Sequence, residues 1–174
     1  MKKKSYIKTA LFLASLAMLS SCLKDSQYAE NFQAAKPLVE LPGAANVSGT
    51  AGPFEIDSLA VNPSATTPLN VAVNLASPHT LSSGLTVGLS VNAAALTAYN
   101  TANGTNYQLL PAADYTSTLS TTIPAGQNLA NVVVNIITSK IDPTQSYVLP
   151  LTITNGGGQQ ISNYNTILYQ LPLK

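Results

Sequence analysis

The stretch LNVAVNL (Leu69–Leu75) places large apolar side chains at every odd position and Asn or Ala at every even position. Side chains two apart in a β-strand lie on the same face, so this segment would have one buried and one wetter face. The same period of two recurs in LTVGLSV (Leu85–Val91) and in YVLPLTI (Tyr147–Ile153). These segments predict strands of an antiparallel sheet, because such sheets commonly bury one face only.

Five further segments fit strands: Leu38–Leu41, Phe54–Val61, Leu119–Ile123, Leu129–Ile137 and Asn165–Leu171. Within the second of them the apolar positions change parity between Ile56 and Leu59, which predicts a β-bulge. Pro150 lies inside another predicted strand and has no N–H to donate to a neighbour. That strand is therefore expected at a sheet edge or locally distorted.

Turn-forming pairs such as Pro42-Gly43, Asn62-Pro63 and Asp142-Pro143 fall between the predicted strands. About eight strands at this spacing predict a mostly β protein, folded as an antiparallel, immunoglobulin-like β-sandwich. A closed barrel is the alternative architecture.

One segment, Asn92–Thr116, breaks the period of two. Asn92 suits the N-cap of a helix, the alanine-rich residues after it favour a helix, and Gly104 suits the left-handed position that ends one. Leu96 and Tyr99 would lie on one face of that helix and pack against the sandwich. The sequence therefore predicts one short helical excursion between strands.

The first 22 residues have the layout of an export signal. Four lysines in the first eight residues precede the apolar run ALFLASLAML (Ala10–Leu19), which is shorter than the roughly 20 residues that span a membrane. The end of this run, Leu19-Ser20-Ser21-Cys22, resembles the lipobox of bacterial lipoproteins. That resemblance implies that residues 1–21 are removed as a signal peptide and that the Cys22 thiol carries a lipid. Residues 22–36 then read as a lipidated flexible tether and 37–174 as the β-sandwich domain.

The charge balance argues against one class of partner, and the cysteine content excludes an intramolecular disulfide. Residues 22–174 contain four lysines, no arginine and seven acidic residues, which gives a net charge of −3. A nucleic-acid-binding surface needs clustered Lys and Arg, so nucleic acid is not an expected partner. Cys22 is the only cysteine, so no intramolecular disulfide can form.

Candidate catalytic residues are few. The single histidine, His79, lies in a predicted loop without a nucleophile motif beside it, which indicates a solvated side chain. Glu55 and Asp57 share one face of a predicted strand, whereas glycosidase carboxylates usually lie about 5–10 Å apart across a cleft. The sequence predicts no catalytic residue, no metal site and no cofactor.

Aromatic side chains offer a candidate ligand site near the C-terminus. Sugar-binding faces commonly stack sugar rings on exposed aromatic side chains that are flanked by Asn and Gln. Tyr164 and Tyr169, with Asn163 and Asn165, fit that composition. Packing of the tyrosines in or near the core is the alternative interpretation.

A short motif suggests a modification. The tripeptide Asp57-Ser58-Leu59 resembles the Asp-Ser/Thr-apolar acceptor of O-glycosylation in Bacteroidetes secreted proteins. The resemblance implies a glycan on Ser58, and chance occurrence of so short a pattern is the alternative.

Three segments in order resemble a known family: YNTANGTNYQLLPAADY (Tyr99–Tyr115), TIPAGQ (Thr122–Gln127) and YVLPLTIT (Tyr147–Thr154). They are similar to the N-terminal module of Bacteroidetes surface lipoproteins that is known as domain of unknown function 1735. The similarity covers about residues 37–172. It implies a β-sandwich on an outer-membrane lipoprotein, often encoded near glycan-uptake machinery, and the family has no established catalytic residues to transfer.

These observations predict a non-enzymatic lipoprotein that is held at the outer membrane by Cys22. We expect it on the cell surface, with the periplasmic side as the alternative location. The expected function is binding or adhesion, with glycans or other envelope proteins as partners, either through direct glycan binding or as an accessory of glycan uptake. The alternative function is a structural or assembly module that docks onto a larger envelope complex.

Overall fold

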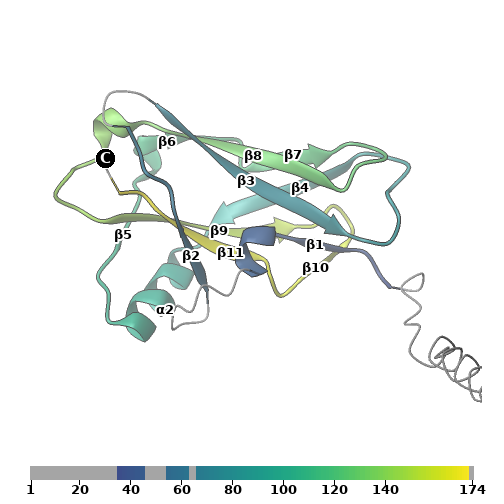
Figure 1. The fold of residues 1–174 in the computed structure, drawn as a ribbon, viewed down its shortest axis with the longest axis horizontal. Coiled ribbons are helices and arrows are strands. Elements are labelled where there is room, and N and C mark those ends of the chain that lie inside the picture. The colour runs from purple at the N-terminus through teal and green to yellow at the C-terminus, as the bar shows by residue number, and fades with distance from the viewer. Residues whose placement is uncertain (1–34, 46–53, 63–65, 173–174) are drawn as a thin grey trace, which may run out of the picture. The chain divides into compact units, whose positions relative to one another are not determined.

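Two β-sheets pack face to face in the computed structural model, which describes residues 35–45, 54–62 and 66–172 (Figure 1). The five-stranded sheet has the order β10 (Gln160–Ile161), β1 (Leu38–Glu40), β3 (Thr67–Ala76), β8 (Leu129–Ile136) and β6 (Tyr115–Thr116). The six-stranded sheet has the order β2 (Glu55–Ser58), β11 (Thr166–Gln170), β9 (Tyr147–Asn155), β4 (Leu85–Val91) and β7 (Ser120–Ile123), with β5 (Gln108–Leu109) paired to β9. One α-helix, α2 (Ala93–Asn103), and three short 3₁₀ helices, η3 (Pro42–Ala45), η4 (Ala112–Asp114) and η5 (Thr138–Lys140), complete the described elements.

This arrangement confirms the mostly β sandwich and the helical excursion. Most neighbouring strands are antiparallel, as predicted, but β1–β10, β2–β11 and β5–β9 are parallel. Parallel neighbours need a long connection, and each of these pairs joins segments that are far apart in the sequence. The immunoglobulin-like topology stays a prediction.

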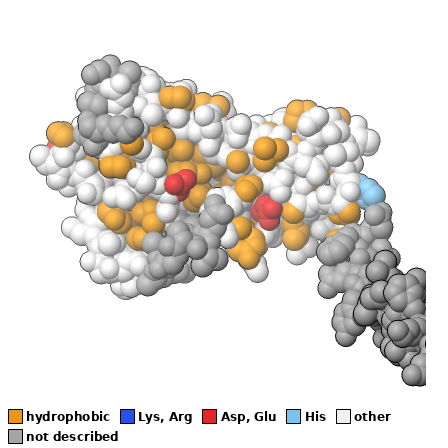
Figure 2. All heavy atoms as spheres, viewed as in Figure 1, with side chains coloured by type: hydrophobic (Ala, Val, Ile, Leu, Met, Phe, Trp, Pro, Cys, Tyr) orange, Lys and Arg blue, Asp and Glu red, His pale blue; other side chains and the backbone are white. Residues whose placement is uncertain are grey.

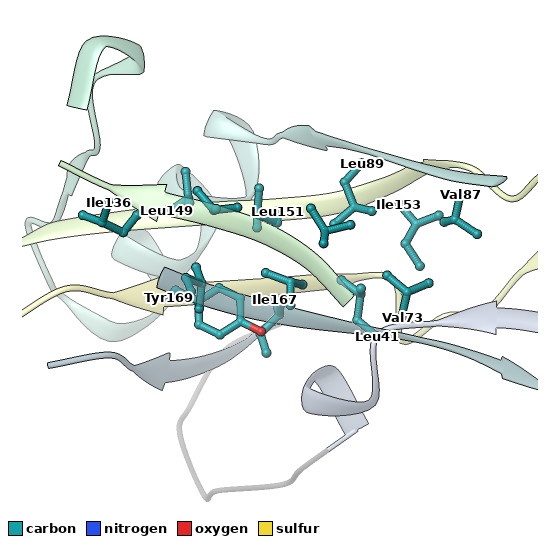
Figure 3. Packing of buried hydrophobic residues seen from close by; sticks show 14 of the residues in the cluster. Leu41, Val73, Val87, Leu89, Ile136, Leu149, Leu151, Ile153, Ile167 and Tyr169 are labelled. Atoms are coloured by element: carbon teal, nitrogen blue, oxygen red, sulfur yellow. The ribbon is translucent and has the colours of Figure 1, made fainter. Parts of the chain in front are cut away.

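The core lies between the two sheets, and the predicted period of two fills it. The odd-numbered apolar residues of β3 (Leu69–Leu75) are at most 5% exposed, whereas Asn70 on the opposite face is exposed. Leu149, Leu151 and Ile153 of β9 meet them from the other sheet (Figure 3). Each fully buried aliphatic side chain contributes about 1.5–3 kcal/mol relative to an exposed one.

Pro150 lies in a central strand, so the expectation of an edge strand is wrong. β9 has β11 on one side and β4 and β5 on the other. The Pro150 carbonyl accepts a hydrogen bond from the N–H of Asn92 (3.0 Å), the residue that follows β4. Pro150 therefore occupies the gap between β4 and β5, where the missing N–H interrupts no ladder.

The bulge that the sequence predicts between Ile56 and Leu59 is not formed in the described stretch 54–62. β2 pairs with β11 without a register shift, and the N–H groups of Leu59 and Val61 continue the pairing. Ile56 packs under α2, whereas Leu59 and Val61 pack against the inner core. The apolar parity changes because both faces of this segment are covered, and alternation itself continues.

The helix α2 covers the outer face of the six-stranded sheet (Figure 1). The Asn92 side chain accepts a hydrogen bond from the N–H of Ala95 (3.1 Å), and Gly104 has a φ of 64°, which confirms both predicted helix ends. Leu96 and Tyr99 pack, as predicted, in a second apolar cluster with their helix neighbour Ala95 and with Val148 of β9 and Leu168 of β11.

The predicted signal peptide, residues 1–21, lies outside the described residues, as do Cys22 and most of the predicted tether. Contacts group Ala35–Lys174 into one unit, and the domain bounds expected from the sequence stay a prediction. In the described part of the chain, no helix combines the length and the apolar character needed to cross a membrane.

Candidate functional site

A hollow of about 430 Å³ lies at the edge of the five-stranded sheet, where β10 pairs with β1. It is lined by one residue of β1 and by a continuous segment that begins in β10: Leu38, Gln160, Ile161, Ser162, Asn163 and Tyr164. We call it the Tyr164 hollow. Its volume lies near the lower end of the roughly 300–1,000 Å³ common for small-molecule sites.

An irregularity in the β1–β10 pairing shapes this hollow. The N–H of Ser162 donates to the Val39 carbonyl (2.9 Å), as in a regular parallel ladder. The next bond runs from the N–H of Leu41 to the carbonyl of Tyr164 (2.8 Å), two residues later than regular pairing would place it. The chain therefore bulges outward at Ser162 and Asn163, and the N–H of Tyr164 closes the bulge on the Ser162 hydroxyl (3.2 Å).

The glycine turn before β10 sets where this segment starts. Gly157 has a φ of 62°, and a Cβ there would lie 2.5 Å from a methyl of Leu85 and 2.5 Å from the Thr86 carbonyl oxygen. Only glycine fits both this conformation and this close approach to β4. The Asn155 side chain also accepts a hydrogen bond from the N–H of Gly157 (2.9 Å). The turn is therefore held tightly against the six-stranded sheet before the chain crosses to β10.

The exposed side chains of the hollow are an aromatic ring and two amides. Tyr164 is 50% exposed although its carbonyl accepts a hydrogen bond from Leu41, the residue that follows β1. Gln160 and Asn163 are also exposed, whereas Leu38 and Ile161 are half-buried. None of the lining side chains carries a charge at neutral pH. The hollow thus offers an apolar ring face, an apolar floor and neutral hydrogen-bonding groups.

A chain of hydrogen bonds holds the segment from behind. The Asn92 amide donates to the Thr152 hydroxyl (3.0 Å), which is bonded to the Thr166 hydroxyl (2.8 Å). Thr166 is also 2.9 Å from the Asn165 side-chain oxygen. These hydrogen bonds connect the N-cap of α2 to Asn165, the residue beside Tyr164. They hold the Tyr164 backbone in place through β9 and β11.

The structure brings two of the four predicted ligand residues together. Asn163 and Tyr164 line the hollow. Asn165 does not line it, and its side-chain oxygen accepts a hydrogen bond from the Thr166 hydroxyl. Tyr169 does not match its expected surface position: it is 7% exposed, because alternation in β11 turns its ring into the inner core. Burial, and secondarily the negative charge of Asp57, raises the pKa of the Tyr169 phenol to about 12.

Four lining residues escaped the sequence analysis: Leu38, Gln160, Ile161 and Ser162. Gln160 had a usable signal, because it follows the triple-glycine turn and precedes an Asn-Tyr pair by a few residues. Leu38 had none, because it comes from the opposite end of the domain sequence. Only the parallel pairing of β1 with β10 brings it to the site.

The other candidate residues do not join this hollow. His79 is exposed, and its N–H donates to the Ser77 hydroxyl (3.2 Å), which fits the predicted loop. Asp57 and Ser58 are both exposed on the edge strand β2, so the Ser58 hydroxyl is accessible, and its glycosylation stays a prediction. No three His, Cys, Asp or Glu side chains gather into a metal-binding group within the ranges that the structure covers.

Comparisons with known proteins place the chain among modular relatives. A family model described as a "-like, N-terminal domain" matches residues 43–160. Comparison with curated proteins finds no match. Several solved structures share the fold, and three of them are informative.

A proposed carbohydrate-binding protein from Bacteroides ovatus is 19% identical, with a TM-score of 0.60 over 78% of this chain and 36% of its own. A multidomain protein from the same species that includes DUF1735 is 16% identical, with a TM-score of 0.62 over 79% of this chain and 45% of its own. An auxiliary nutrient-binding protein from Bacteroides thetaiotaomicron is 17% identical, with a TM-score of 0.57 over 74% and 46%. At these identities the likeness shows the fold alone. This chain spans less than half the length of those structures.

Proposed function

The chain belongs to the family of DUF1735-like N-terminal modules, and from this premise we propose that it is a non-enzymatic sugar-binding module of the bacterial envelope. The Tyr164 hollow is the observation that carries the proposal. A half-exposed tyrosine ring beside two exposed amides suits a sugar, which has apolar C–H faces and hydroxyl edges. The lining contains no carboxylate, imidazole or thiol to serve as an acid, a base or a nucleophile.

Two of the structural relatives support the same direction, since one is a proposed carbohydrate-binding protein and another an auxiliary nutrient-binding protein. Both chains are more than twice the length of the part that matches. Their ligands therefore enter this proposal only as a class, sugars and other nutrients, and name no binding residue of this chain.

A glycan array with the mature protein, purified from membranes in detergent, tests the proposal. We expect hits that disappear in Tyr164→Ala and persist in Tyr164→Phe, because phenylalanine keeps the ring face. Val133→Ala, on an exposed position of β8 outside the hollow, is the matched control and should change nothing. An array without hits, or hits that Tyr164→Ala leaves unchanged, would refute sugar binding at this hollow.

We further propose that Cys22 anchors the module by a lipid at the outer membrane, facing the cell surface. The motif Leu19-Ser20-Ser21-Cys22 and the short apolar run before it support this anchor. Cys22→Ser should abolish incorporation of labelled fatty acid and release the protein from the membrane fraction. Protease treatment of intact cells locates it, because a fully protected protein would lie on the periplasmic side.

A second candidate function, docking onto a larger envelope complex, has its own supporting observation. Leu129 and Val133 of β8 are 55% and 46% exposed and point to the same outer face of the five-stranded sheet. Between and beside them lie neutral side chains, Asn131 and Asn70 among them. Cross-linking in native membranes tests this function: a specific protein adduct lost in Leu129→Asp and kept in Tyr164→Ala would favour docking over sugar binding.

A further inference from the structure

We infer that the Tyr164 hollow selects uncharged sugars and rejects uronic or sulfated ones, an inference that rests on the proposed function and names its ligand class. A carboxylate or sulfate loses its hydration on binding, and Arg or Lys donors compensate that loss most strongly. The six lining residues include no cation. The lining therefore has no positive charge to pair with an acidic sugar.

The charged residues nearest in sequence do not supply a positive field. Lys36 precedes Leu38 by two residues and Glu40 follows it by two, so the two opposite charges flank the same lining residue. The Glu40 carboxylate accepts a hydrogen bond from the Asn74 amide (2.9 Å), which keeps it beside β3. An anionic sugar would meet one cation and one anion rather than a basic patch.

Lys140, the other described lysine, lies at the far end of the sheet. It follows the end of β8 that pairs with Thr67, whereas Leu38 pairs with Ala76, the last residue of β3. Nine residues of extended strand separate these positions by about 30 Å. The Lys140 amine also donates to the Ala113 carbonyl (2.8 Å), and this bond holds it at that end of the sheet, away from the hollow. On the face that Figure 2 shows, most of the described side chains are uncharged, a few are acidic and no described lysine is visible.

The hydrogen-bonding groups of the hollow match hydroxyls better than anions. The amides of Gln160 and Asn163 are exposed, and neither has a partner among the described residues of the protein. Each amide presents a donor and an acceptor, which is also the capacity of a sugar hydroxyl. A carboxylate or sulfate only accepts, so it could use the amide donors but would leave the amide oxygens without a donor. The Tyr164 ring adds stacking, which does not depend on charge.

Affinity electrophoresis of the mature, detergent-purified protein tests the inference with matched polymers. Each gel contains a neutral polysaccharide (dextran, α-mannan, a β-glucan or a galactan) or the sulfated derivative of the same polymer. We expect at least one neutral polymer to retard the protein, its sulfated form to act at least tenfold more weakly, and Tyr164→Ala to abolish retardation. Lys36→Ala is the control variant and should leave the retardation by the neutral polymer unchanged.

The possible outcomes distinguish sugar binding itself from the selection for uncharged sugars. Stronger retardation by a sulfated polymer than by every neutral one, weakened by Lys36→Ala, would overturn the selection for uncharged sugars and leave sugar binding in place. Retardation by neither class would overturn sugar binding itself and this inference with it. Circular dichroism of each variant checks that a loss of retardation reflects the site and not unfolding.

Discussion

Two segments of the chain carry the same three residues, Tyr-Asn-Thr, and bury opposite members of them. In α2, Tyr99 is 4% exposed while Thr101 is exposed. Before β11, Tyr164 is 50% exposed while Thr166 is 7% exposed. The burial of each residue therefore follows the period of the element and what covers it, and the tripeptide itself decides neither.

Tyr99 and Tyr164 also differ in the residues that surround them. The Tyr99 ring lies 6.2 Å from the Tyr107 ring, centroid to centroid, at a tilt of 30°, and packs on Val148 and Leu168. Tyr164 has its carbonyl bonded to Leu41, the residue that follows β1, and its ring at the rim of the hollow. One tyrosine is a packing residue and the other is a surface group on a fixed backbone, and the following predictions test that contrast.

The largest effect is expected from Tyr99→Ala. Removal of a buried aromatic ring leaves a cavity, so the free energy of unfolding should fall by roughly 3–5 kcal/mol. Urea denaturation followed by circular dichroism measures it. Tyr99→Phe, which keeps the ring, should cost much less. A loss below 1 kcal/mol for the alanine variant would mean that α2 is not packed as described.

A third tyrosine, Tyr169, extends the contrast to pH. Burial and the charge of Asp57 raise its pKa to about 12, above the usual value near 10. The neutral phenol is thus favoured in the folded state. Its contribution to stability is complete below pH 10 and is lost as the pH rises to 12, by roughly 2–3 kcal/mol. Unfolding free energies from urea denaturation at pH 9 and at pH 12 test this, and the loss between the two should be smaller in Tyr169→Phe by roughly 2 kcal/mol.

The next largest difference in stability is expected between the two asparagines of the repeated tripeptide. The Asn100 side chain makes three hydrogen bonds. Its NH2 group donates to the Tyr107 carbonyl (2.9 Å), and its oxygen accepts from the Thr105 hydroxyl (2.8 Å) and from the Tyr107 N–H (3.1 Å). Among the described residues, the Asn165 side chain bonds only to Thr166. Asn100→Ala should therefore lower the unfolding free energy by about 2 kcal/mol, and Asn165→Ala by about 1 or less. Equal losses in thermal unfolding would contradict this ranking.

The smallest stability effect belongs to Tyr164→Ala. A half-exposed ring at a rim contributes little to packing, so the unfolding free energy should change by no more than about 0.5 kcal/mol. Sugar binding, in contrast, should be lost. A variant that unfolds much more easily and binds as before would make Tyr164 a packing residue like Tyr99.

Much of the local structure could be predicted because it depends on neighbours in sequence. The alternation in Leu69–Leu75 predicted the buried face of β3, and Asn92 and Gly104 predicted the ends of α2. The pair Asn163-Tyr164 was predictable as a surface feature, since it follows a glycine turn among neutral polar residues. The two-residue strands β5, β6 and β10 were not, because so short a segment shows no period.

The sequence by itself determined the period of each long segment, its caps and turns, and the charge balance of residues 22–174. Each of these depends on residues a few positions apart, which is why pattern reasoning reached them. Only the tertiary structure decided that Pro150 sits between β4 and β5, that Ile56 packs under α2 while Leu59 and Val61 pack in the inner core, and that Tyr169 points inward. It alone created the Tyr164 hollow, because parallel pairing brings Leu38 to Gln160, more than a hundred residues later in the chain. Such contacts arise from which apolar faces bury each other in the complete sandwich, and no local pattern encodes that choice.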